Sequence, residues 1–164
     1  MADELEPAAQ VATGFLAAWS GRDAAAFAEI CDPGVHYEDP LTTTPLRGPV
    51  ELGEHATQLW GAFPDVRVEA ADEPSAGARA IAVPCVLHGT HHAPLGGLPA
   101  TGRGLRVHGV FWAERGLDGR LLRVRAFFDL WDAGVQLGLL PARGGAGEKA
   151  LFLLRGFGLR ATGR

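Results

Sequence analysis

Apolar residues in the first 65 positions recur every three or four residues, which is the spacing of an amphipathic helix. Three helices are predicted from this spacing: one over 5–19, a short one that Asp23 caps and that ends before Pro33-Gly34, and one after Gly48-Pro49. Between the second and third helices, Val35 to Glu38 reads as a short strand that ends at Asp39-Pro40.

From Val66 onward the pattern changes to alternation, which is typical of strands. Strands are predicted from Val66, over 80–89, over 105–114 and over 121–128, with turns at 74–77 and 116–119 and a Gly/Pro-rich loop over 94–102. Helices that precede a run of antiparallel strands indicate an α+β fold. We therefore expect three N-terminal helices packed on a curved, mainly antiparallel sheet that encloses a pocket.

The last 23 residues differ from the rest. Residues 1–141 are predicted to form one cone-shaped domain, and 142–164 a Gly-rich linker followed by an apolar, arginine-containing tail. Three alternatives stay open for this tail: docking on its own chain or on a dimer partner, disorder, or a helix on a membrane surface.

The composition excludes several classes of function. The length of 164 residues suits one core, and the single lysine, Lys149, disfavours Schiff-base chemistry and excludes a phosphate-binding loop. Two cysteines, Cys31 and Cys85, read as buried free thiols. A net charge of −4 and the absence of a signal peptide or a long apolar run predict a cytoplasmic protein that binds neither nucleic acid nor membrane. No cofactor is expected.

Two stretches of the chain resemble the SnoaL-like polyketide cyclases of the nuclear-transport-factor-2-like superfamily. They are Gly89 to Arg103 and Asp118 to Pro141. The resemblance covers roughly residues 5–141 and implies a cone with an internal pocket. At the positions of the family's acid/base aspartate and histidine, this chain has Ala126 and, on the neighbouring strand, Phe111.

A second resemblance is to the ketosteroid isomerases of the same superfamily. The segment from Val35 to Pro40 is similar to theirs that ends in Glu-Asp-Pro, which implies that Asp39 is a proton-shuttling base. The segment from Val124 to Phe128 is similar to their last strand. Phe15 stands where these isomerases have an oxyanion-binding tyrosine on the first helix.

Asp39 is the first candidate for catalysis. Pro40 holds Asp39 extended at the end of a strand, and desolvation beside aromatic rings is expected to raise its pKa. The alternative is a turn aspartate that binds local amides. Strand alternation places Tyr37, the only tyrosine, on the same face, where its phenol could serve the reaction. His91, at the mouth of the loop, is the third candidate.

The remaining histidines are not expected to bind a metal. His88 and His92 alternate away from His91, so only two of the three converge unless His108 joins them from the next strand. His108 is expected on the outer face of the sheet, where we predict a homodimer interface. On that face Arg125 is expected to pair with an acid, and Asp129 could cap a segment that begins at Leu130.

The pocket wall is expected to be largely aromatic. Its predicted members are Phe15, Trp19, Trp60, Phe63, Phe111, Ala126 and Phe128. An apolar cavity with one carboxylate is typical of a small-molecule site. The predicted function is binding of a small hydrophobic carbonyl compound, with cyclase- or isomerase-type chemistry by an Asp base. The alternative is a non-catalytic ligand-binding or dimerisation module of the same fold.

Overall fold

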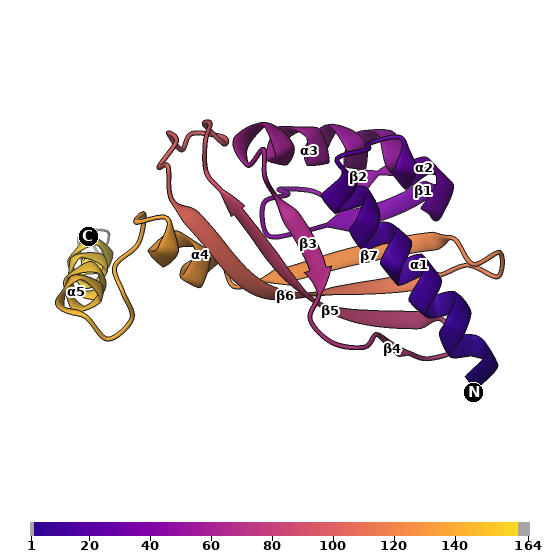
Figure 1. Cartoon of the computed structure of the whole chain (residues 1–164). Helices are drawn as coiled ribbons and strands as arrows, with labels where there is room; N and C mark the ends of the chain where they lie inside the picture. The colour runs from indigo at the N-terminus through magenta and orange to yellow at the C-terminus, as the bar shows by residue number, and fades with distance from the viewer. Residues whose placement is uncertain (1, 161–164) are drawn as a thin grey trace.

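The computed structural model describes residues 2–160, and Figure 1 shows its first three helices lying over one face of a curved sheet. The three predicted N-terminal helices are present as α1 (Ala2–Gly21), α2 (Ala26–Ile30) and α3 (Gly48–Ala62). Pro49 stands in the first turn of α3, where the missing N–H of proline costs nothing. The α+β class is confirmed.

One sheet contains all seven strands of residues 2–160. They are β1 (Cys31–Glu38), β2 (Leu46–Arg47), β3 (Arg67–Ala70), β4 (Ser75–Ala76), β5 (Ala80–Thr90), β6 (Gly104–Arg115) and β7 (Leu121–Phe128). The order is β2-β1-β7-β6-β5-β3, with β4 also paired to β5. Only β1 and β7 run parallel; every other pair is antiparallel. The predicted, mainly antiparallel sheet is therefore confirmed.

The structure extends β1 beyond its predicted start. Pro33-Gly34 does not separate a helix from a strand, because α2 has already ended at Ile30 and β1 begins at Cys31. The dipeptide instead coincides with a shift in register against β7 between Cys31 and His36. The Asp32 side chain accepts a hydrogen bond from the Gly34 amide at 2.7 Å. The Gly34 amide therefore has a local partner within the irregular part of the strand.

Two further helices follow the sheet. Helix α4 (Leu130–Gln136) begins where Asp129 accepts a hydrogen bond from the Asp132 amide, as expected for a cap. Helix α5 (Ala146–Arg160) begins inside the predicted linker and lies beyond α4, away from the other helices (Figure 1). Among residues 2–160, no helix combines the length and the apolar run that crossing a bilayer requires.

The core lies between the helices and the inner face of the sheet. Phe27 stacks on Trp60 at a centroid distance of 6.4 Å, and the Trp60 indole N–H donates to the carbonyl of Trp19 at 2.9 Å. The Ser20 hydroxyl donates to the carbonyl of Val68 and accepts from its amide, both at 2.9 Å. These bonds tie α1 to α3 and to β3, so three elements that surround the pocket keep a fixed spacing.

Gly109 in β6 leaves the space that the ring of Phe128 occupies. A Cβ atom at this position would overlap that ring and would lie 2.6 Å from the carbonyl oxygen of Phe127. Without a side chain at 109, the Phe128 ring packs directly on the backbone of β6. Phe128 also meets Phe111 edge to face, with centroids 5.6 Å apart.

We expect Gly109→Ala to destabilise the protein by about 1–3 kcal/mol, because Phe128 must leave its position or the strands must separate. Gly104→Ala in the same strand is the matched control, since its Cβ would meet only the carbonyl of Gly89 at 4.0 Å. Urea unfolding of both variants measures the difference. Equal midpoints would show that Phe128 does not depend on Gly109.

Candidate active site

The inner face of the sheet and the helices enclose a cavity of about 400 Å³. Its wall is formed by Trp19, Tyr37, Asp39, Pro40, Leu41, Leu59, Phe63, Val66, Val68, Leu87, Leu95, Leu98, Leu105, Val107, Phe111, Phe128, Leu130, Ala133, Gly134, Leu137, Leu139 and Leu140. Among these lining residues, Asp39 is the only one with a charged side chain. A ligand therefore meets hydrocarbon on nearly every side and one carboxylate.

Asp39 is held by the turn that follows β1. Its Oδ1 accepts the backbone amides of Leu41 at 2.8 Å and Thr42 at 3.0 Å, and the Thr42 hydroxyl donates to its carbonyl at 2.9 Å. Asp39 is thus a turn aspartate that binds local amides, and it also lines the cavity. The turn-aspartate interpretation is therefore confirmed, and the role of Asp39 as a base stays a prediction.

The second oxygen, Oδ2, joins Asp39 to two other side chains. The Tyr37 hydroxyl donates to it at 3.1 Å, as expected for residues on one face of a strand, and His55 Nε2 lies 2.6 Å away. The Asp39 and His55 side chains are 6% and 14% exposed. We call these three residues the Asp39 cluster.

His55 was not predicted as a site residue. It lies in α3 three residues after Leu52 and four before Leu59, so it belongs to the stripe that faces the sheet. The signal that could have revealed it is a histidine on the buried stripe of the helix that follows the candidate base along the chain.

The pKa of Asp39 is lowered, and the prediction that it would be raised is wrong. Burial does raise it, as expected. The hydrogen bond and positive charge of His55, the Leu41 amide and the Tyr37 hydroxyl together outweigh burial. Burial, the charge of Asp39 and the hydrogen bond to Asp39 raise the pKa of Tyr37 well above its usual value. The cluster therefore pairs an ionised carboxylate with a neutral phenol.

His91 is placed outside the wall of this cavity. It is buried, its ring stacks on Phe63 at a centroid distance of 5.0 Å, and its Nδ1 lies 3.3 Å from the Thr101 hydroxyl. Its backbone pairs with Arg103 and Gly102 across the loop. His91 thus supports Phe63, which lines the cavity, while the Asp39 cluster assembles without it.

The predicted wall residues divide into two groups. Four line the cavity: Trp19, Phe63, Phe111 and Phe128. The other three, Phe15, Trp60 and Ala126, are buried but are not among the lining residues. Phe15 packs against Phe111 with centroids 5.2 Å apart, so it lies one layer behind the wall.

The other predicted side chains are spread over the surface. His108 is exposed beside Arg106, with 3.1 Å between ring and guanidinium nitrogens, and Arg125 pairs with Glu38 at 3.3 Å as expected. Across the described residues, no group of three histidine, cysteine or acidic side chains is arranged to hold a metal ion. The homodimer stays a prediction.

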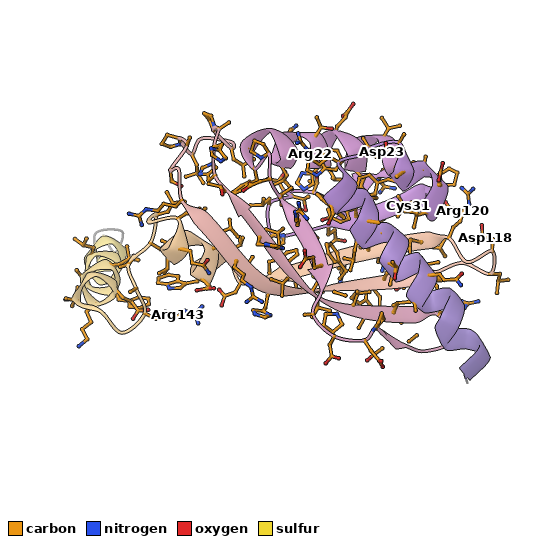
Figure 2. The ribbon with its side chains drawn as sticks, viewed as in Figure 1. Arg22, Asp23, Cys31, Asp118, Arg120 and Arg143 are labelled. Atoms are coloured by element: carbon orange, nitrogen blue, oxygen red, sulfur yellow. The ribbon has the colours of Figure 1, made fainter. Side chains whose placement is uncertain are left out.

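Both cysteines are buried free thiols, as predicted. Burial raises the pKa of Cys31 and of Cys85 to about 12, which leaves neither as a thiolate nucleophile at neutral pH. Figure 2 shows Cys31 next to Arg120, whose guanidinium donates to the Cys31 carbonyl at 3.4 Å. Neither cysteine lines the cavity.

The fold and cavity define a cone-shaped α+β protein built around a small-molecule-sized apolar cavity with one carboxylate. The model of the SnoaL-like polyketide cyclases matches residues 9–137, and the chain belongs to that family. No curated protein matches this sequence.

Solved structures share the fold. A protein from Jannaschia sp. CCS1, proposed to be a SnoaL-like polyketide cyclase, is 18% identical with a TM-score of 0.73 over 84% of this chain and 94% of that one. IdmH from Streptomyces antibioticus, proposed to be a polyketide cyclase, is 22% identical with a TM-score of 0.69 over 80% and 98%. A protein of ketosteroid isomerase-like fold from Catenulispora acidiphila is 14% identical with a TM-score of 0.68 over 79% and 92%.

The lowered pKa of Asp39 makes stability depend on pH in a defined direction. Its contribution is present above the unfolded-state pKa, near 3.8, and is lost as the pH falls through the lower folded-state value. We expect the free energy of unfolding to fall more steeply between pH 4 and pH 2 in the wild type than in Asp39→Asn. Urea titrations at several pH values measure both slopes, and parallel curves would contradict the lowered pKa of Asp39.

Proposed function

We propose that this protein binds a small, hydrophobic carbonyl compound of the polyketide type in the cavity and that Asp39 removes a proton beside the carbonyl. The observation that carries the proposal is the position of Asp39. It is the one charged side chain on the wall, and its carboxylate is ionised because its pKa is lowered. Family membership supports the substrate class.

The reaction starts with proton transfer from carbon to Asp39. The C–H bond breaks, an O–H bond forms on the carboxylate, and the electron pair moves onto the carbonyl oxygen to give an enolate. The enolate carbon then attacks a second carbonyl of the same molecule. That attack forms the C–C bond that closes the ring and restores the first carbonyl, and the resulting alkoxide takes the proton back from Asp39, which is a carboxylate again.

Tyr37 supports this step by turning its hydroxyl. The carboxylate of Asp39 has about four acceptor sites, and four donors occupy them: two backbone amides, His55 and Tyr37. Tyr37 lines the cavity, and its phenol is the one donor of the four whose hydrogen can change direction by rotation about the C–O bond. When the Tyr37 hydroxyl hydrogen turns toward the ligand, it frees an acceptor site on Asp39 Oδ2 for the incoming proton and gives the enolate oxygen a hydrogen-bond donor.

The alternative is a binding module without catalysis. Two observations favour it: Ala126 provides no second acid, and a carboxylate with a lowered pKa is a weaker base. The two functions differ in one measurable property, since only a catalyst labilises a C–H bond of a bound ketone.

We expect wild-type protein to accelerate deuterium incorporation from D₂O into the methyl group of 2-acetylnaphthalene, followed by proton NMR. Asp39→Asn should lower the enzymatic rate about 10²–10⁴-fold, the usual contribution of a positioned base. Asp65→Asn is the matched control, because Asp65 is an exposed carboxylate that binds Thr90. Binding without exchange by the wild type would establish the binding module, and full activity in Asp39→Asn would exclude Asp39 as the base.

His55→Leu tests the positioning role of His55. Loss of its hydrogen bond and charge should raise the pKa of Asp39, so the acid limb of the exchange rate should move to higher pH. The pH profile of deuterium exchange measures this shift. Tyr37→Phe should lower the plateau of that profile instead, and an unchanged plateau would remove the phenol from the mechanism.

A further inference from the structure

The indole N–H of Trp19 is a buried donor at the wall of the cavity. Trp19 lies in the last turns of α1, is 3% exposed and lines the cavity. Its Nε1 has no accessible surface and no hydrogen-bond partner among the described residues. Trp60, its neighbour in the core, differs in this respect, because its own indole N–H donates to the Trp19 carbonyl at 2.9 Å.

The surroundings of Trp19 explain why the donor lacks a protein partner. Five rings pack around the indole, from Phe15, Phe27, Tyr37, His55 and Trp60, at centroid distances between 5.5 and 6.5 Å. None of these rings accepts a hydrogen bond from Nε1. Buried donors in native proteins nearly always have a partner, so an orphan beside a binding cavity points to a ligand.

Trp19 also lies next to the Asp39 cluster. Its ring is 6.0 Å from that of Tyr37 and 6.5 Å from that of His55, centroid to centroid, and both of these residues bind Asp39. A ligand carbonyl held near the phenol is therefore also near the indole. Two donors on one oxygen are the usual arrangement for stabilising an enolate.

We propose that the Trp19 indole N–H donates a hydrogen bond to the carbonyl oxygen of the cavity ligand, as a specificity-determining contact beside Tyr37. The inference rests on the proposed function only in that the ligand binds in this cavity and carries a carbonyl group. Because Nε1 is buried, the proposed bond requires a small rotation of the indole toward the cavity. The contact selects flat, apolar molecules with a carbonyl oxygen at one edge over hydrocarbons of the same shape.

The direct test is the indole N–H resonance of Trp19 in ¹⁵N-labelled, full-length protein. The four tryptophans give four side-chain signals, which single Trp→Phe variants assign. 2-Acetylnaphthalene should move the Trp19 proton downfield, whereas 2-isopropenylnaphthalene, in which a CH₂ group replaces the carbonyl oxygen, should not. The same shift with both ligands would overturn the proposal.

Affinity gives a second readout. Trp19→Phe should bind 2-acetylnaphthalene about tenfold more weakly and 2-isopropenylnaphthalene with unchanged affinity. Trp60→Phe is the matched control: it loses a hydrogen bond that ties α3 to α1, so it should lower the urea midpoint without changing the preference between the two ligands. Equal loss for both ligands in Trp19→Phe would show that the indole only fills space.

The outcomes separate this inference from the proposed catalysis. A carbonyl-specific shift of the Trp19 signal in a protein that does not exchange the methyl protons would support the contact and refute the base. Deuterium exchange that depends on Asp39, together with the same Trp19 shift for both ligands, would support Asp39 as the base and refute the Trp19 contact. If Trp19→Phe does not fold, the resonance of the wild-type protein still decides, with Trp19 assigned by elimination from variants of the other three tryptophans.

Discussion

The short contact between Asp39 and His55 is the interaction on which the site depends. It brings together the turn after β1 and the buried stripe of α3, 16 residues apart in sequence. A lone carboxylate on an apolar wall would take up a proton or turn to solvent, because burial disfavours its charge. His55, the two backbone amides and Tyr37 instead keep the charge at the cavity, with the side chain only 6% exposed.

The packing of the aromatic side chains gives this cluster a rigid frame. Phe27 and Trp60 stack behind the wall, and the Trp60 indole fixes α3 to α1. On the opposite side, Gly109 lets Phe128 lie on the sheet and meet Phe111. These rings lower the local polarity around the cluster, which strengthens the hydrogen bonds within it and makes an unpaired donor such as Trp19 Nε1 costly.

The periodicity of the chain was sufficient for the parts that depend on neighbouring residues. It predicted the three helices, the long antiparallel strands and the common face of Tyr37 and Asp39. It was not sufficient where elements distant in sequence meet. The sign of the Asp39 pKa shift depends on His55, which only the packing of α3 on β1 brings into contact. Ala126 and Phe128 were both expected at the cavity, but only Phe128 lines it, and the short Ala126 side chain is buried without reaching the wall.

The arrangement of polar atoms on the wall limits what the cavity can recognise. Hydrocarbon walls distinguish ligands weakly, since one extra methylene changes binding by only about 1–3 kcal/mol. A buried polar group discriminates more strongly, because a ligand that cannot bond to it leaves it unpaired. Among the lining residues, the side chains that carry polar atoms are those of Asp39, Tyr37 and Trp19, and they lie together in one region of the wall. The ligand that we propose would therefore be oriented by one polar edge, while Phe63, Phe111 and Phe128 would limit the size of its apolar body.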